Sequence, residues 1–351
     1  MAQNSLEIDF FYVDSGEKSG DAITIRYGDY ENKQNQFVIV IDGGTITTGR
    51  NMVSHIQEVY GTNYVDLVIC THPDGDHASG LREIVKEMKV KELWMHQPWE
   101  HSEDIKHLFK DGRMTENSLS QKLKEAYGFA YDLEEIAKQK KNITIKEPFA
   151  GLSFNNSTIQ VLGPSEEYYL ELVPNFMKTP EAKTPIFGQI ASSVKKGINW
   201  IRETMDIETL DENGVTTGEN NSSAVVLLRF DNRDYLFTGD SGIPSLKHVI
   251  QYSNKRGISL KNLCFFQVPH HGSRRNSSPY VLNEIKATTA YISAAKDSDK
   301  HPSRKVINAL IRRGAKVYST EGNSLSHHVN CKSRQGYTTA VAHQFYEQVQ
   351  E

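Results

Sequence analysis

Four side chains able to bind metal ions fall within six positions of this chain, directly after an apolar run at 65–70. They are His72, Asp74, Asp76 and His77. Carboxylates this close repel one another, and burial without partners would raise their pKa values. One or two divalent cations reverse that balance, so the spacing predicts a metal site at the end of a buried strand. The alternative is a solvated acidic turn, because the Pro-Asp-Gly at 73–75 also favours turns.

The composition limits the class of protein. The chain has 351 residues and a formal net charge of −4, which excludes a globally basic nucleic-acid binder but not a local basic patch. No run approaches the roughly eighteen apolar residues of a membrane span, and no signal peptide is visible. The three cysteines are widely spaced along the chain. We therefore expect a cytoplasmic protein that does not contact membranes.

Strands and helices alternate along the chain in two similar halves. Each half has mostly antiparallel strands followed by strand–helix repeats, the first from about residue 8 and the second from about residue 224. A charged, helical stretch at about 101–141 and an irregular one at about 165–221 interrupt this rhythm. The pattern predicts a single domain, residues 1–351, in which two sheets pack together with helices outside and these two stretches are insertions.

Further polar residues follow strands of the second half. Asp240 ends the strand predicted at 235–238, and His270 and His271 follow the strand predicted at 263–268. Carboxyl ends of strands in α/β sheets are the usual place for functional side chains. Each has an alternative interpretation: Asp240 could cap the next helix, and the histidine pair could simply be exposed. Their occurrence together with the 72–77 cluster favours a shared site.

In this order, the motifs resemble the metallo-β-lactamase superfamily, and more narrowly the metallohydrolase domain of the ComEC-like competence and DNA-uptake proteins. The resemblance covers about 6–165 and 219–320. It is carried by the 72–77 cluster, Gly239-Asp240 and the Pro-His-His-Gly-Ser at 269–273, with further matches at Gly20-Asp21-Ala22, Ile41-Asp42-Gly43-Gly44, Val161-Leu162-Gly163-Pro164, Asn221-Ser222-Ser223 and His301-Pro302.

This resemblance implies an α+β fold, a four-layer αββα sandwich with a metal site where the two sheets meet. It implies His72 and Asp74 as ligands of one ion, Asp76 and His77 as ligands of the other, and Asp240 as the bridge. His271 is the preferred final ligand. The residues expected to support these ligands or contact substrate are Asp42, Asn221, His270 and Ser273; Asp42 is expected to orient a ligand histidine, although a plain turn aspartate is the alternative.

Two departures from the common pattern bear on the metal. Asp74 stands where the superfamily most often has histidine, and Asn220-Asn221-Ser222 occupies the region where another histidine is usual. The first site therefore loses two imidazoles and gains a carboxylate. Oxygen-rich sites favour Mn²⁺ or Mg²⁺ over Zn²⁺. We expect one or two divalent ions, zinc or manganese, with magnesium as a further candidate.

The leading functional hypothesis is a metal-dependent hydrolase, a phosphodiesterase or nuclease that uses a metal-activated water. Asp76 and His301 are the candidate catalytic residues; His301 could protonate the leaving oxygen, contact a phosphate, or be a surface histidine. One alternative is hydrolysis of a lactone, thioester or other carbonyl substrate, because the superfamily hosts many reactions on one fold. Another is a binding or scaffold protein with a degenerate metal site.

The expected partner is nucleic acid or a nucleotide-like phosphodiester. Three basic pairs, Lys195-Lys196, Arg274-Arg275 and Arg312-Arg313, could track a phosphate backbone. Solvated surface charge is the alternative for each pair. Ser273 together with Arg274-Arg275 could hold a phosphate through charge-assisted hydrogen bonds.

Overall fold

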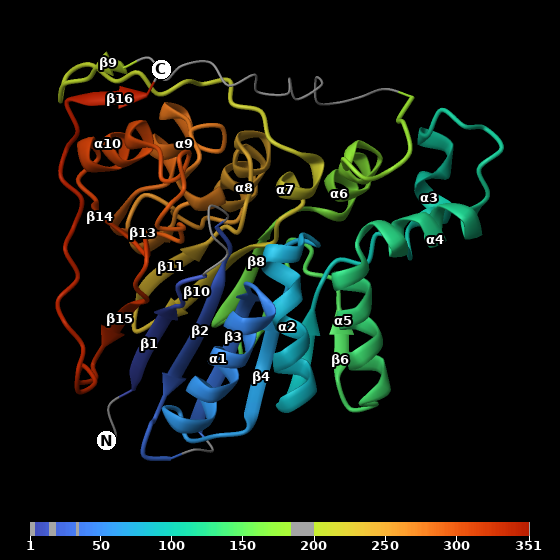
Figure 1. The fold of residues 1–351 in the computed structure, drawn as a ribbon, viewed down its shortest axis with the longest axis horizontal. Helices are drawn as coiled ribbons and strands as arrows, with labels where there is room; N and C mark the ends of the chain where they lie inside the picture. The colour runs from blue at the N-terminus through green and yellow to red at the C-terminus, as the bar shows by residue number, and fades with distance from the viewer. Residues whose placement is uncertain (1–3, 14–18, 33–34, 184–199, 351) are drawn as a thin grey trace.

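The computed structural model describes residues 4–13, 19–32, 35–183 and 200–350, and two seven-stranded sheets form its centre (Figure 1). The first sheet has the order β15-β1-β2-β3-β4-β5-β6. Its strands are β1 (Ser5–Phe10), β2 (Ala22–Gly28), β3 (Gln36–Gly43), β4 (Tyr64–Ile69), β5 (Lys89–Trp94), β6 (Thr144–Lys146) and β15 (Leu325–Val329). Pairing is antiparallel from β15 to β3 and parallel from β3 to β6.

The second sheet repeats this division into a parallel and an antiparallel half. Its order is β14-β13-β12-β11-β10-β8-β7. Pairing is parallel from β14 to β11 and antiparallel from β11 to β7. Its strands are β7 (Ser153–Phe154), β8 (Ile159–Gly163), β10 (Val225–Phe230), β11 (Arg233–Phe237), β12 (Leu263–Gln267), β13 (Ala287–Ile292) and β14 (Lys316–Ser319).

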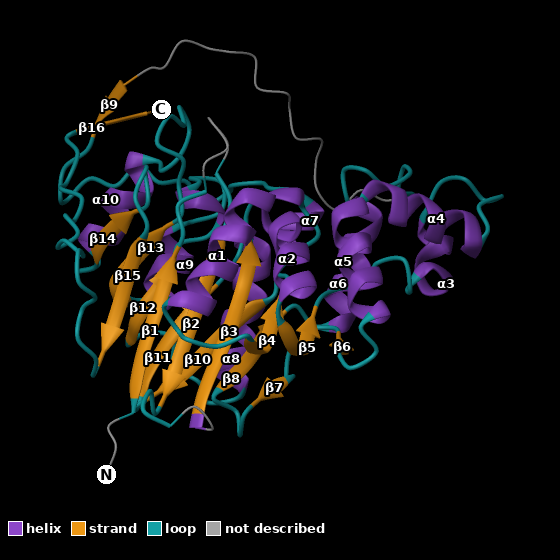
Figure 2. Ribbon diagram, turned by 60° about the horizontal axis from the view of Figure 1, so that its bottom comes forward, coloured by secondary structure: helices purple, strands orange, loops and turns teal. Residues whose placement is uncertain are grey.

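Helices cover the outer face of each sheet (Figure 2). Over the first sheet lie α1 (Ile46–Glu58), α2 (Gly75–Glu87) and α5 (Gly128–Gln139), and over the second lie α8 (Ile243–Lys255), α9 (Pro279–Glu284) and α10 (Arg304–Arg312). Alternate side chains of β3 separate the layers: Val38 and Val40 pack against the helices, while Ile39 and Ile41 enter the core between the sheets. The predicted four-layer αββα sandwich is confirmed.

Helix α2 begins within the 72–77 cluster. It starts at Gly75, with Asp74 at its N-cap position, so Asp76 and His77 lie in its first turn. The Asp74 side chain makes no capping hydrogen bond, although aspartate usually accepts one there. Its carboxylate is therefore free to face the site.

The first interrupting stretch is helical, as its sequence indicates, and the second contains more regular structure than expected. The first forms α3 (Ser102–Ile105), a 3₁₀ turn (Lys106–Leu108), α4 (Glu116–Ala126) and α5, and α3 and α4 extend beyond α5 at one end of the molecule (Figure 1). The second contains α6 (Glu166–Leu172), a 3₁₀ turn (Val173–Asn175), β9 (Trp200–Arg202) and α7 (Gly218–Asn221). Lys195 and Lys196 lie outside the described residues. Strand β9 pairs with β16 (Gln348–Gln350). Among the described residues, no helix has the length and apolarity to cross a bilayer.

A contact between three glycines places α2 against the sheet. A Cβ atom at Gly80 of α2 would lie 1.9 Å from the carbonyl oxygen of Gly43, and one at Gly49 of α1 would lie 2.2 Å from the Gly80 oxygen. The Gly80 N–H donates a 3.0 Å hydrogen bond to the Gly44 carbonyl. Backbones approach this closely only without side chains. The contact therefore fixes the first turn of α2 beside the end of β3.

A second cluster joins the helical stretch to the end of the first sheet. Glu147 directly follows β6, and its Oε2 lies 2.8 Å from His101 Nε2. Its Oε1 accepts a 2.9 Å hydrogen bond from the Gln97 N–H. Burial raises the pKa of Glu147, but the hydrogen bond from His101 and the neighbouring His96 lower it from 4.5 to about 2. The folded protein therefore favours the ionised carboxylate.

We expect Gly80→Ala to destabilise the protein by about 3 kcal/mol, because backbone on both sides would have to move. Chemical unfolding of the metal-free protein measures this. Gly112→Ala is the matched control, since a Cβ there would meet nothing within 4 Å. Equal stabilities for the two variants would contradict the close-approach argument.

Glu147→Gln should cost on the order of 3 kcal/mol near pH 6 and less as the pH falls towards 3. The folded pKa of Glu147 is depressed, so its stabilisation is fully present above about pH 4.5 and is lost as the pH falls through about 2. Unfolding free energies of the metal-free protein at several pH values give the comparison. Glu135→Gln, at an exposed pair with Lys138, should be nearly neutral throughout.

Candidate metal centre

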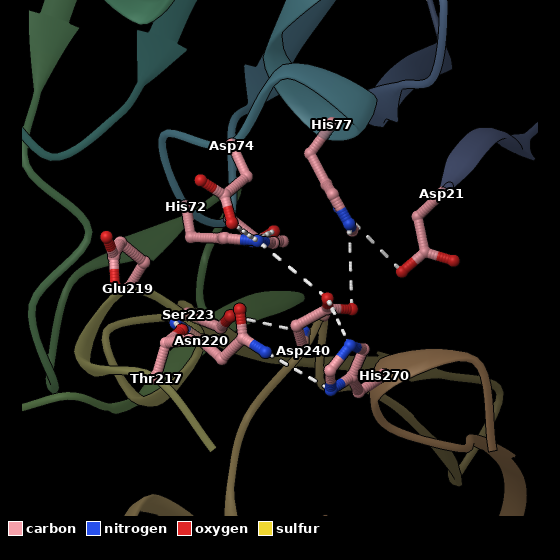
Figure 3. Close-up of polar contacts among 12 residues, drawn as sticks. Asp21, His72, Asp74, His77, Thr217, Glu219, Asn220, Ser223, Asp240 and His270 are labelled. Atoms are coloured by element: carbon pink, nitrogen blue, oxygen red, sulfur yellow. Dashed lines mark hydrogen bonds and ion pairs between the residues drawn. The ribbon is translucent and has the colours of Figure 1, made fainter. Parts of the chain in front are cut away.

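Asp240 lies at the centre of a cluster of imidazoles and carboxylates at one edge of the sandwich (Figure 3). It follows β11, and the chain turns into it through Gly239, which has a positive φ of 49°. Its Oδ1 lies 3.6 Å from His77 Nε2 and 3.7 Å from His271 Nε2. Its Oδ2 lies 3.9 Å from His72 Nε2 and 3.7 Å from His270 Nε2. The first sheet contributes His72 and His77, and the second sheet contributes the other residues.

The predicted ligand residues of the 72–77 cluster converge on this carboxylate. His72 Nε2 lies 3.7 Å from Asp74 Oδ2. The possible ligand atoms of His72, His77 and Asp240 lie within 4.8 Å of one another, and so do those of Asp76, His77 and His271. All six residues predicted as ligands therefore lie in these groups or within a few ångströms of them.

The unpaired atoms of this cluster fit a metal. His72 Nε2, His77 Nε2 and Asp240 Oδ1 are buried and have no hydrogen-bond partner among the described residues. Leaving buried polar atoms unpaired costs free energy, so each needs a ligand. Donors bound about 2.1 Å from a tetrahedral ion stand roughly 3.4 Å apart. The spacings of 3.6–3.9 Å around Asp240 are close to that separation.

Asp42 orients the end of β4 and the ring of His77. Its buried carboxylate accepts hydrogen bonds from the Thr71 N–H at 2.8 Å, the Thr71 hydroxyl at 2.7 Å and His77 Nδ1 at 2.8 Å. In its neutral form, with the proton held on Nδ1 by Asp42, the imidazole of His77 presents the lone pair of Nε2 to Asp240. Asp42 itself has a positive φ of 54°, a conformation that aspartate tolerates better than most residues.

Asp21 is a site residue that the sequence reasoning did not assign. It is buried just before β2, its Oδ2 lies 3.9 Å from His77 Nδ1, and it forms a possible ligand group with Asp240 and His271. The Gln267 amide donates a 2.6 Å hydrogen bond to it. Burial is the main cause that raises the pKa of Asp21 to about 6. The Gly20-Asp21-Ala22 motif was the signal that could have identified it.

His270 and His271 lie in a strained turn, Pro269 to Ser273, that directs both rings towards Asp240. Their φ angles are 47° and 56°, in the left-handed region that residues other than glycine rarely adopt. His271 Nδ1 lies 3.0 Å from the Ser293 carbonyl, which fixes its proton on that nitrogen. The His301 ring centroid is 5.4 Å from that of His270 and 6.0 Å from that of His271. His301 therefore borders the cluster.

Two residues expected to contact substrate have other partners. Asn221 is fully buried, and its side-chain N–H donates to the Thr217 carbonyl at 2.8 Å within α7. Its neighbour Asn220 lies 3.1 Å from His270 Nδ1 instead. The Ser273 hydroxyl accepts a 3.2 Å hydrogen bond from the Arg275 N–H, so it closes the turn.

Burial and neighbouring charges oppose each other in their effects on the pKa values of Asp240 and His77, and act together on those of Asp74 and His301. Burial raises the pKa of Asp240, but His270, His271 and His77 hold it well below its usual value. Burial lowers the pKa of His77, but Asp240 and Asp42 raise it well above 6.5. Burial and the adjacent Asp76 raise the pKa of Asp74 to about 6. Burial and the neighbouring His271 and His270 lower the pKa of His301 to about 3.

One predicted basic pair is unavailable for a phosphate backbone. Arg312 is paired with Glu203 at 3.0 Å and Arg313 with Glu208 at 2.9 Å, and both pairs tie α10 to the chain after β9. Structural pairing explains these charges. Arg274 and Arg275 are both exposed beside the histidine turn.

Comparisons with known proteins agree with the motifs. The family model of the metallo-beta-lactamase superfamily matches residues 33–296, well over half of the chain. ComE operon protein 3 of Bacillus subtilis is 30% identical over 107 residues, which are 30% of this chain and 13% of that protein. Recombination protein 2 of Haemophilus influenzae is 27% identical over 126 residues, which are 35% of this chain and 15% of that protein. The chain thus spans only about a seventh of the length of these relatives.

A solved structure of a metal-dependent hydrolase of the beta-lactamase superfamily aligns with 92% of this chain and 98% of its own, at a TM-score of 0.41 and 13% identity.

Asp42→Asn should lower the affinity of the site for a divalent ion about 10–100-fold, because His77 loses the acceptor that fixes its ring. Titration of chelator-stripped protein with Zn²⁺ or Mn²⁺ measures the affinity. Asp66→Asn is the matched control: Asp66 is also buried and accepts the Val38 N–H at 2.9 Å, but it does not contact the cluster. An unchanged affinity in Asp42→Asn would contradict the orienting role.

Proposed function

The chain belongs to the metallo-beta-lactamase superfamily, as its motifs predict, and on that premise we propose that it is a metal-dependent phosphodiesterase or nuclease. One observation carries the proposal: the buried Asp240 carboxylate has imidazole nitrogens beside each of its two oxygens. A carboxylate placed this way can bridge two cations. Two metal ions bound close together suit displacement at phosphorus, because the attacking oxygen and the leaving oxygen both need stabilisation.

The resemblance, and the oxygen of Asp240 that each histidine faces, support a division of the ligands between two ions. We assign His72, Asp74 and Asp240 to the first ion, and Asp76, His77, His271 and Asp240 to the second. Such ions supply an activated water and neutralise the negative charge that develops on the reacting phosphate. Zinc and manganese both suit this mixture of imidazole and carboxylate, and the carboxylate of Asp74 favours the harder ions, manganese and magnesium.

Residues beside the ions would hold and orient the substrate. Because the pKa of His301 is lowered to about 3, its ring is neutral at pH 7 and offers one N–H to a phosphate oxygen. Arg274 and Arg275 follow the histidine turn and add positive charge near it. This arrangement supports an anionic substrate.

With Mn²⁺, the protein should hydrolyse bis(p-nitrophenyl) phosphate, and Asp76→Ala should lower kcat/KM at least about a hundredfold because a metal ligand is lost. Asp211→Ala changes an exposed aspartate that belongs to none of the ligand groups of the described residues; it is the control and should retain activity. Release of p-nitrophenol is followed by absorbance, and metal content is measured on the same samples. Turnover of lactone or thioester substrates alone would favour carbonyl chemistry, and bound metal without any turnover would favour a binding protein.

A further inference from the structure

The first ion has too few ligands if only the family-like residues are counted. His72, Asp74 and Asp240 supply three atoms, and the region 220–222, where a further histidine is usual, holds asparagine and serine. The second ion has Asp76, His77 and His271 in addition to Asp240. The two halves of the centre are therefore unequal unless another residue completes the first.

His270 is placed to complete it. The two carboxylate oxygens of Asp240 face different histidines. Oδ1 faces His77 and His271, and Oδ2 faces His72 and His270. The distance from Oδ2 to His270 Nε2 is 3.7 Å. His270 thus lies beside the oxygen of the first ion, as His271 lies beside the oxygen of the second. Two consecutive residues of one turn each serve one half of the centre.

The hydrogen bonds of Asn276 fix the tautomer of His270. The Asn276 amide N–H group donates to the Asp240 carbonyl at 2.9 Å and to the Ser241 carbonyl at 3.3 Å, so its Oδ1 faces the other way. That oxygen lies 2.9 Å from His270 Nδ1 and can only accept. The proton of His270 is therefore on Nδ1, and Nε2 presents a lone pair towards Asp240, as a metal ligand must.

Asn220 is compatible with this tautomer. Its amide nitrogen is placed 2.7 Å from the Thr216 hydroxyl and 3.1 Å from His270 Nδ1. A hydroxyl can donate as well as accept, so the amide can be turned to place its oxygen between two donors. Asn220, which lies in the region where a histidine is usual, then helps to orient the ring of His270.

We propose that His270 Nε2 is a ligand of the first metal ion and replaces the histidine absent at 220–222. This inference rests on the proposed two-ion centre. Among the described residues, the ligand atoms of His72, His77 and Asp240 all lie within 4.8 Å of one another, but no such group contains His270. Binding of the first ion therefore requires the His270 ring to move inward. The ring is not fully enclosed, since 26% of its side chain is exposed.

Metal counting tests the assignment. Chelator-stripped protein is titrated with Mn²⁺ or Co²⁺, and bound metal per chain is determined by calorimetry and elemental analysis. The wild type should bind two ions, and His270→Ala should lose the weaker or bind it about 10–100-fold less tightly. His271→Ala should weaken the other ion, and His301→Ala, which removes the neighbouring ring, should retain both.

The outcomes separate this inference from the proposed function. Two ions of unchanged affinity in His270→Ala would overturn the assignment while leaving the hydrolase intact, with His270 then a substrate contact. A single ion in the wild type would also overturn it, whereas phosphodiester turnover could persist. No bound ion in the wild type would overturn both proposals.

A measurement on the wild type avoids reliance on a folded variant. Long-range ¹H–¹⁵N NMR spectra of the histidines, recorded with successive additions of Zn²⁺, report the nitrogen that binds. Nε2 of His270 should shift with the same ion as Nε2 of His72, and Nε2 of His271 with the same ion as that of His77. A His270 signal that is unchanged when both ions are bound would refute the proposal.

Discussion

A carboxylate held among imidazoles in a buried position is the constraint around which this molecule is built. Burial of Asp240 would be costly alone, and the histidines that surround it come from two different sheets. Each must therefore arrive with the correct ring orientation. Asp42 provides this for His77, the Ser293 carbonyl for His271 and Asn276 for His270.

The backbone satisfies that constraint through close contacts and strained turns. The glycine contact of α1, α2 and β3 sets the height of α2, and hence of Asp76 and His77, above the sheet edge. On the opposite side, left-handed residues 270 and 271 turn two consecutive side chains towards one carboxylate. Such conformations persist only where the surrounding structure stabilises them, and they concentrate at functional sites.

The site residues that directly follow recognisable strands could be predicted from the sequence, and the long-range contacts that support them could not. The 72–77 cluster, Asp240 and the histidine pair at 270–271 stood out because each follows a recognisable strand, and the resemblance favoured His271 of the pair. Asp21 meets Gln267 across 246 positions, and no local pattern signals that contact. Asn220 and Asn221 differ only in which way a short helix turns them, so the sequence could not choose between them. The Arg312–Glu203 ion pair could not be predicted either, because its two residues are far apart in the sequence. The layers were predictable because apolar periodicity records which strand faces are buried.

The location of the centre across the seam between the sheets has a thermodynamic consequence. His72 and His77 belong to one sheet and His271 to the other, so ions bound there act as cross-links between the two halves of the fold. Ligands that bind only the folded state stabilise it by mass action, by about 2.7 kcal/mol at a hundred times the dissociation constant. The cohesion of the two sheets is thereby coupled to the free metal concentration around the protein. Scarcity of metal would weaken the architecture as well as the chemistry.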